Sequence, residues 1–295
     1  MQLKSINKNI INWGILVLLG LTWGSSFILM KKGLQVFTAQ ELGALRIFAA
    51  AVFLLPWSLI HLGRLHGHQY RYLLLSGLIG TLVPAFLVAQ AQMQLDSAVS
   101  GILNSLVPVF VLLIGNIWFR QAMVRNELFG ALIGLFGASL LIFLSAEQGI
   151  GRVNYYALLP LAACCLYGLN TNLIKYRLQG LPSTAIISVS FLFIGAIAGV
   201  VLFTQTDFVS KLRVVEGASI AMGYVLLLGI WGTAIAQLFL IKLIQRTSPV
   251  FASMVSFLIP LVALGWGLLD GEVLALGQCL GVIIILGGVY LVNKR

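Results

Sequence analysis

Long apolar runs, separated by short polar or charged breaks, make up almost the entire chain. A helix needs about 20 mainly apolar residues to cross the hydrocarbon core of a bilayer, and the runs are close to that length. They predict helices near residues 13–31, 41–62, 70–92, 97–119, 126–144, 154–174, 184–204, 218–243, 249–269 and 274–292. We therefore predict an all-α membrane protein with ten transmembrane helices.

Two stretches of the chain repeat each other. The segment Tyr72–Thr81 returns 152 residues later as Tyr224–Thr233, with its Tyr, two Leu, two Gly and final Thr at the same positions. A second offset, of 144 residues, relates the first and sixth predicted helices by matching Trp23, Gly24 and Lys31 with Tyr167, Gly168 and Lys175. A repeat of this length indicates duplication of one structural unit.

The duplication divides the chain into residues 1–145 and 146–295, each with five predicted helices. Because five is an odd number, the second repeat must enter the membrane upside down relative to the first. Inverted repeats of this kind form many secondary transporters, whose substrate site lies near the bilayer midplane between the repeats. The pattern therefore predicts two inverted five-helix repeats.

Composition agrees with a membrane protein and restricts its partners. Of the 295 residues, 60% are hydrophobic and 9% are charged, whereas soluble proteins have roughly 45–50% and 25%. The net charge of +10 does not indicate nucleic acid, because the Lys and Arg lie in small groups between apolar runs. The expected partners are the lipid bilayer and a small-molecule substrate. Glycine-rich fifth and tenth helices would suit either a monomer or a homodimer.

The same charges predict the topology. Twelve of the 18 Lys and Arg fall in one set of alternate loops, and cytoplasmic loops carry an excess of these residues. We expect a bacterial-type inner-membrane protein with both termini in the cytoplasm. The first span lacks a small-residue cleavage site, so we expect it to be retained. The three cysteines lie inside apolar runs without metal or disulfide spacing, and we expect no cofactor or metal.

Polar side chains recur inside the apolar runs, where an unpartnered polar group is unfavourable. Two pairs occupy matching positions in the two halves, namely Ser26 with Asn170 and Asn104 with Ser256. Amide, hydroxyl and aromatic groups of this kind suit a neutral or zwitterionic metabolite with an apolar part. The residues predicted to line a substrate cavity are Trp23, Ser26, Thr81, Gln90, Ser100, Asn104, Tyr167, Asn170, Trp231, Thr233, Gln237 and Ser256.

A purely structural explanation competes with the cavity at each position. A single Ser or Thr in a membrane helix commonly bonds to its own backbone or to a neighbouring helix, and we favour that explanation for these residues. The cavity is favoured for Asn104, Asn170 and Gln237, because an amide has more donors and acceptors to satisfy. Trp23 and Tyr167 leave both explanations open, since such rings also form interfacial belts.

Arg46 is the clearest charge inside a predicted span. An unpaired guanidinium in lipid is unfavourable, so it should reach an interface or bond to carbonyl groups. The alternative is that Arg46 acts as counter-ion to a substrate carboxylate. No Asp or Glu lies in the middle of a predicted span, so tight proton coupling has no visible carboxylate carrier.

Several of these motifs together resemble the EamA branch of the drug/metabolite transporter superfamily. The resemblance covers essentially the whole chain and rests on the order and spacing of Trp23–Phe27, Arg46, the Pro108 helix, Gly271–Glu272 and the helix with Gly281 and Gly288. It implies a ten-helix exporter of small metabolites, often amino acids, whose pore is lined by helices 1, 3, 4, 6, 8 and 9. Ala39 departs from the family pattern, which often has Pro there.

The sequence therefore predicts a secondary transporter that exports small organic metabolites, such as amino acids, by alternating access. Transport of another cargo is the first alternative, but a nucleotide sugar would require several cationic groups in the cavity and a cationic drug a buried carboxylate. A lipid is a third possible cargo. An intramembrane enzyme is the weaker alternative, because no His, Asp or Glu lies in the middle of a predicted span to act as a catalytic base.

Overall fold

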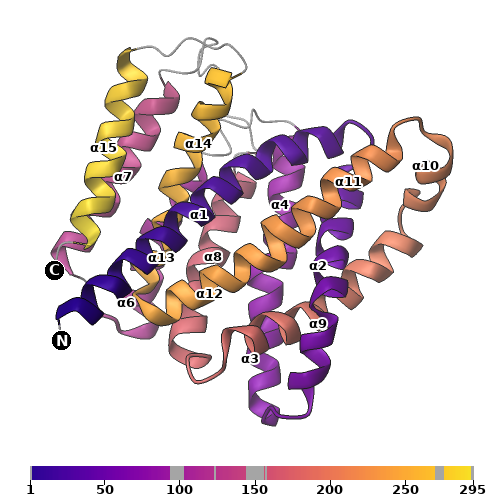
Figure 1. Ribbon diagram of the computed structural model, residues 1–295, viewed down its shortest axis with the longest axis horizontal. Helices are drawn as coiled ribbons and strands as arrows, with labels where there is room; N and C mark the ends of the chain where they lie inside the picture. Colours follow the sequence, from indigo (N-terminus) through magenta and orange to yellow (C-terminus); the bar gives the residue numbers. More distant parts are fainter. Residues whose placement is uncertain are drawn as a thin grey trace.

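In the computed structural model, every regular element of the described residues is a helix, and the helices pack side by side as a bundle (Figure 1). The structure describes residues 2–93, 103–122, 124–143, 156, 158–269 and 276–293. The first half contains α1 (Gln2–Leu34), α2 (Ala39–Leu62), α3 (Gly67–Gly77), α4 (Val83–Gln92), α6 (Val107–Phe119) and α7 (Arg125–Phe143). The second half contains α8 (Leu158–Arg177), α9 (Ser183–Thr204), α10 (Phe208–Val214), α11 (Ala218–Gly229), α12 (Ala236–Arg246), α13 (Pro249–Ser253), α14 (Val255–Leu269) and α15 (Leu276–Asn293).

Helices occur within all ten predicted ranges, and five of the described helices are long and apolar enough to cross a membrane. These five are Asn9–Leu34, Ala39–Leu62, Gly67–Ala91, Ser183–Thr204 and Ala218–Arg246. The shorter apolar helices are Val107–Phe119, Pro249–Val262 and Ile283–Val292. The start of α1 and the end of α15 lie at the same edge of the bundle in Figure 1.

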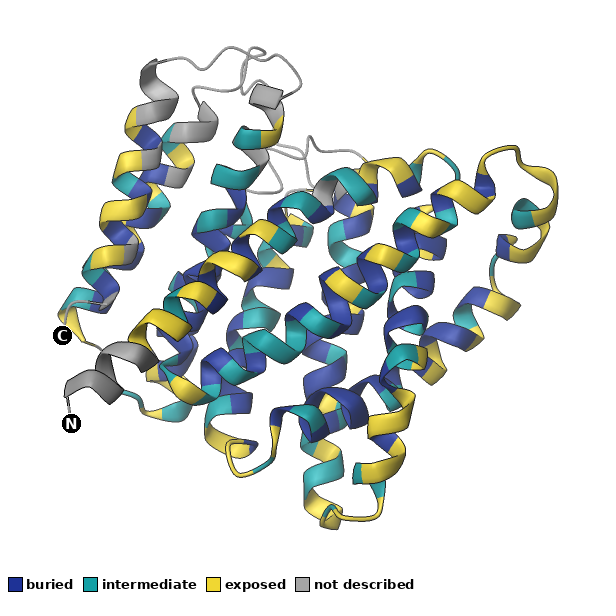
Figure 2. Cartoon of the chain, in the orientation of Figure 1, coloured by how far each residue is buried: buried dark blue, intermediate teal, exposed yellow. Residues whose placement is uncertain are grey.

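The outer surface is apolar, as expected for helices that face lipid. On α9, Ile197, Val200 and Phe203 are exposed at intervals of three residues and form a stripe along one face. Figure 2 shows such exposed faces on the outside of the bundle, with buried residues between the helices. A soluble protein seldom exposes long apolar stripes of this kind.

Two predicted helices contain a π-helical turn at matching positions. Leu78–Leu82, here η1, connects α3 to α4, and Ile230–Ile235, here η3, connects α11 to α12. Both turns fall at the end of the repeated sequence, 152 residues apart. A π turn adds one residue to a helical turn and is often found at functional sites. The sequence repeat therefore corresponds to a repeat of an unusual backbone conformation.

The fourth and ninth predicted helices are interrupted, which corrects the expectation of a continuous helix. The helix α6 begins only at Val107, with Pro108 in its first turn, where the missing N–H leaves no helical bond unmade. The ninth range is divided at Met254 into α13 and α14, and the Met254 N–H bonds to the Phe251 carbonyl in a tighter turn, at 3.2 Å.

The two halves pack against each other through glycines at equivalent positions. A Cβ atom at Gly24 on α1 would lie 2.5 Å from the Val262 Cβ on α14, and one at Gly168 on α8 would lie 2.9 Å from the Phe110 carbonyl carbon on α6. Gly24 corresponds to Gly168, and Phe110 to Val262, by the offsets of the repeat. The contact between α1 and α14 is therefore repeated, with the halves exchanged, by the contact between α8 and α6.

Candidate functional site

A cavity of about 140 Å³ lies between helices of both halves of the chain. It has roughly ten times the space that one water molecule needs, so it can accept a small organic solute. The residues that line it are Trp23, Ser26, Met30, Arg46, Gly80, Val88, Asn104, Val107, Pro160, Tyr167, Asn170, Thr171, Gln237, Leu240, Ala252, Ser253, Val255, Ser256 and Ile259.

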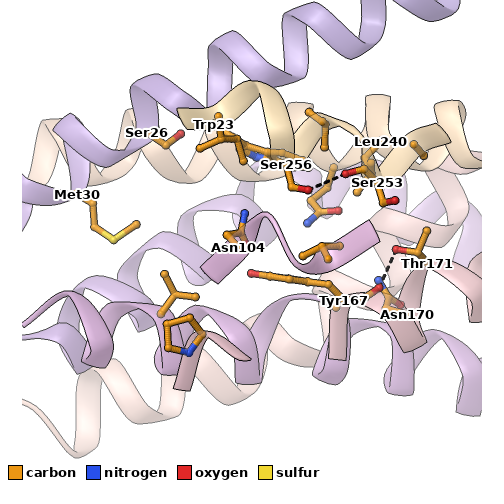
Figure 3. A pocket seen from close by; sticks show the side chains of 18 of the residues that line it. Trp23, Ser26, Met30, Asn104, Tyr167, Asn170, Thr171, Leu240, Ser253 and Ser256 are labelled. Carbon is orange, nitrogen blue, oxygen red and sulfur yellow. Dashed lines mark hydrogen bonds between the residues drawn. The ribbon is translucent and has the colours of Figure 1, made fainter. Parts of the chain in front are cut away.

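More than half of the predicted site residues meet in this cavity (Figure 3). The picture shows the Tyr167 ring reaching across it toward Asn104, with Trp23 and Ser256 on the opposite side. Residues far apart in the sequence therefore converge on one space. The predicted residues found there are Trp23, Ser26, Asn104, Tyr167, Asn170, Gln237 and Ser256.

Four other predicted residues lie elsewhere. Gln90 and Trp231 are exposed, and the buried side chains of Thr81 and Thr233 do not line this cavity. Gln90 follows Thr81 by nine residues, which is two and a half helical turns, so the two face opposite sides. Trp231 likewise precedes Thr233 by two residues and points away from it. The remaining predicted residue, Ser100, lies outside the described part of the chain.

Twelve of the lining residues were absent from the predicted set, and four of them carry a polar, charged or thioether side chain. Met30 and Thr171 line the cavity beside predicted residues on α1 and α8, and Ser253 lies on α13, three residues before the predicted Ser256. Their sequence signal is weak because such side chains are common in membrane helices. Arg46 also lines it. As an intramembrane charge, Arg46 carried a strong signal, but the alternative of an interfacial position made the sequence ambiguous.

The helix α1 is attached to the π turn η3 at the cavity wall. The Trp23 indole Nε1 donates a hydrogen bond to the Gly232 carbonyl at 2.8 Å. A Cβ atom at Gly232 would lie 2.9 Å from the Ser26 Oγ, so the absence of a side chain there allows α1 to approach η3 closely. The Ser26 hydroxyl itself donates to the Thr22 carbonyl at 2.7 Å, one turn earlier in α1. Trp23 therefore has a structural contact in addition to lining the cavity.

The helix α8 contacts the other π turn in the equivalent place. Asn170 packs against Gly80 in η1, and its Oδ1 accepts a hydrogen bond from the Ser76 hydroxyl at 2.7 Å. The Thr171 hydroxyl donates to the Tyr167 carbonyl within α8, also at 2.7 Å. Asn170 thus has one amide oxygen bonded while its side chain still borders the cavity.

The broken ninth helix supplies two hydroxyls and one released carbonyl. The Ser253 and Ser256 hydroxyls donate to the carbonyls of Val250 and Ser253, at 2.7 and 2.8 Å. Pro260 has no N–H to bond the Ser256 carbonyl four residues earlier. That carbonyl accepts a hydrogen bond from Ser105 Oγ instead, at 3.4 Å.

Two amides remain open to the cavity. Within the described residues, the Asn104 and Gln237 side chains line the cavity and have no hydrogen-bond partner. They come from different halves of the chain, Asn104 from the fourth predicted helix and Gln237 from α12. Donors and acceptors that the protein leaves unpaired in a cavity are available to a solute. In the part of the chain that the structure describes, no cluster of three or more His, Cys, Asp and Glu could hold a metal ion.

An apolar outer surface around a cavity with polar lining is the arrangement of a multi-pass membrane protein that transports small molecules. Comparisons with known proteins give the same class. The chain belongs to the EamA-like transporter family, whose model matches residues 12–143 and again residues 154–294.

Two curated relatives span nearly the whole chain. An uncharacterized inner membrane transporter, YedA, of Escherichia coli (strain K12) is 28% identical over 298 residues, covering 95% of this chain and 90% of the relative. An uncharacterized transporter of Archaeoglobus fulgidus is 24% identical and covers 96% and 99%. A solved crystal structure matches the fold with a TM-score of 0.71, at 17% identity and 94% coverage of both chains.

Proposed function

We propose that this protein exports small organic metabolites, such as amino acids or related compounds, across an inner membrane by alternating access. The observation that carries this proposal is the pair of open amides, Asn104 and Gln237, which face one cavity from the two halves. A solute bound between them would contact both halves at once. Relative movement of the halves could then expose it to one side of the membrane or the other.

The proposed architecture is ten spans in two inverted repeats, residues 1–145 and 146–295. Supporting it are the two separate family matches and the reciprocal contacts at matched positions, Gly80 with Asn170 and Gly232 with Ser26. The excess of Lys and Arg in alternate loops supports both termini in the cytoplasm. The name of the Escherichia coli relative supports an inner-membrane location.

Reconstituted transport tests this function. Proteoliposomes would be loaded with labelled amino acids, sugars or nucleosides, and efflux would be followed with and without a pH gradient. We expect efflux of one class of solute, which Gln237→Leu and Asn104→Leu abolish because each removes an amide from the cavity. The gradient arm shows whether protons take part.

A matched control separates the cavity from general effects of the substitution. Gln90→Leu changes the same side chain on the exposed face of α4, and we expect it to leave efflux within about twofold of wild type, as for surface substitutions generally. Equal efflux by wild type and Gln237→Leu, with both proteins inserted, would remove the amide from the substrate site. Absence of efflux for every class of solute would contradict the transport proposal itself.

A further inference from the structure

Arg46 differs in kind from the other residues around the cavity. It is the one Lys, Arg, Asp or Glu among the described residues that line it. Its helix, α2, is among those long and apolar enough to cross a membrane. The guanidinium is therefore placed at the cavity rather than at a helix end, where an arginine could reach the headgroup region.

The protein holds this guanidinium by one edge. The Arg46 Nε donates a hydrogen bond to the Thr233 Oγ1 at 2.6 Å. The Thr233 hydroxyl uses its own proton on the Leu228 carbonyl, at 3.1 Å, so the oxygen is free to accept from the arginine. Thr233 and Leu228 are five residues apart, a spacing that a π-helical turn brings together. The conformation of η3 thus fixes the direction of Arg46.

Most of the donors of Arg46 find no acceptor among the described residues. A guanidinium has five N–H groups, and one is used by Thr233 among the described residues. The one ion pair in the described part of the chain joins Glu41 to Lys211, and no described carboxylate pairs with Arg46. A positive charge in a low-dielectric site without a counter-ion is unfavourable. A ligand that brings a negative charge would compensate it.

The second half lacks an equivalent charge. Ser190 stands at the position that matches Arg46 by the offset of 144 residues, and its hydroxyl donates to the Leu73 carbonyl at 2.8 Å. The space beside Ser190 is a small cavity of about 20 Å³, enough for one water molecule. The first half therefore carries a positive charge that the second half lacks at the equivalent position. This difference would orient a ligand that has one charged end.

We propose that Arg46 binds the carboxylate of the transported solute through its two terminal nitrogens, which are suited to bidentate bonding of a carboxylate. The rest of the solute then lies toward the amides of Asn104 and Gln237 and the Tyr167 ring. The substrate class is a small monocarboxylate with a neutral or amino-bearing remainder. This inference rests on the transport function proposed above and specifies which solutes it serves.

Binding of matched compound pairs to the purified full-length protein tests this inference independently of transport. Each amino acid of a panel is compared with its carboxamide, and each straight or branched carboxylic acid with its amide, by the rise in unfolding temperature in detergent and by competition. We expect the carboxylate to bind roughly 10- to 100-fold more tightly than its amide, as for hydrogen bonds between charged groups. Carboxylates without an amino group show whether the ammonium group is also required.

Substitutions then assign the preference to Arg46. Arg46→Gln should reduce the preference to about twofold or less, and Arg46→Lys should retain part of it, since the charge remains but the bidentate geometry is lost. A purely structural arginine would change stability without changing the ratio of the two affinities. Should Arg46→Gln fail to fold, the wild-type ratio and Arg46→Lys still decide the proposal.

Three results would overturn it. These are equal binding of carboxylates and amides by wild type, an unchanged preference in Arg46→Gln, and no stabilisation by any carboxylate in the panel. Transport of amides as fast as carboxylates would refute the role of Arg46 while leaving the transport function intact. Carboxylate binding without transport would refute the transport function but would still support a carboxylate-binding site at Arg46.

Discussion

The π turns η1 and η3 pack against equivalent backbone positions, but the side chains at those positions differ. Gly77, ahead of η1, packs against Ser190 on α9, and its counterpart Gly229, ahead of η3, packs against the Arg46 carbonyl on α2. The backbone contacts therefore follow the duplication. The side chains at the same place differ, since one half has a hydroxyl and the other a guanidinium.

The first helices of the two halves differ in the same manner. Trp23 bonds to the backbone of η3 through its indole N–H, whereas Tyr167, at the matching position, extends its ring into the cavity (Figure 3). Duplication thus preserves the packing that any helix pair here requires, because close approach depends on small residues and not on their chemistry. The residues that line the cavity diverge, so the two halves have similar helix packing but contribute different side chains to the cavity.

The largest expected effects come from substituting the equivalent glycines Gly24 and Gly168, at which helices of the two halves pack closely. Gly24→Ala and Gly168→Ala should each lower the free energy of unfolding by about 3 kcal/mol, because the new methyl group meets atoms that cannot rotate away. Gly168 is the more severe case, since its neighbour is the Phe110 backbone at 2.9 Å. Unfolding of the purified variants in mixed micelles measures both values.

Two other glycines serve as controls for these substitutions. A Cβ atom at Gly14 on α1, or at Gly223 on α11, would meet no described atom of another helix within 4 Å. Alanine favours the helix by about 1 kcal/mol relative to glycine, so these variants should be as stable as wild type or more stable. A loss at Gly14 as large as that at Gly24 would show that the helix contact is not the cause.

The sequence predicted a helix within each of the ten ranges, because an apolar run and a repeat can be identified without knowing which helices pack together. It did not predict the breaks at Val107 and Met254 or the two π turns, since these depend on bonds that form only when neighbouring helices pack. The site was predicted in part for a related reason. Asn104 and Gln237 were predicted because an amide is difficult to bury without partners. Gln90 and Trp231 were predicted too, but their side chains point away from the cavity. The direction of a side chain around a helix is hard to predict near a π turn, because the extra residue rotates the positions that follow it.

A smaller effect should follow from the matched lysines at the ends of α1 and α8. The Lys175 ammonium donates to the carbonyls of Ile244, Gln245 and Thr247, at 3.2, 3.3 and 2.6 Å, and so caps the end of α12. Lys175→Met should lower the free energy of unfolding by about 2 kcal/mol, the usual range for bonds to a charged group. Hydrogen exchange should also increase at the end of α12.

The matching residue in the first half provides the comparison. Lys31 is exposed at the end of α1 and has no hydrogen bond to a described residue. Lys31→Met should therefore change stability by about 0.5 kcal/mol or less, as for ordinary surface substitutions. Equal destabilisation by the two variants would mean that the lysines act alike, through the membrane interface, and that capping of α12 contributes little.

The smallest effect expected from removing a hydrogen bond concerns the neutral counterpart of Arg46. Ser190→Ala removes the hydrogen bond to the Leu73 carbonyl and should lower the free energy of unfolding by about 1 kcal/mol, without changing the preference for carboxylates. Ser188, two residues earlier on α9, is fully buried and its hydroxyl has no partner in the described part of the chain. Ser188→Ala should therefore be neutral or stabilising, because it removes an unsatisfied buried group. If Ser190→Ala instead altered the carboxylate preference as strongly as Arg46→Gln, both sides of the two-fold relation would contribute to ligand charge, and the asymmetry between the halves would not set the orientation of the solute.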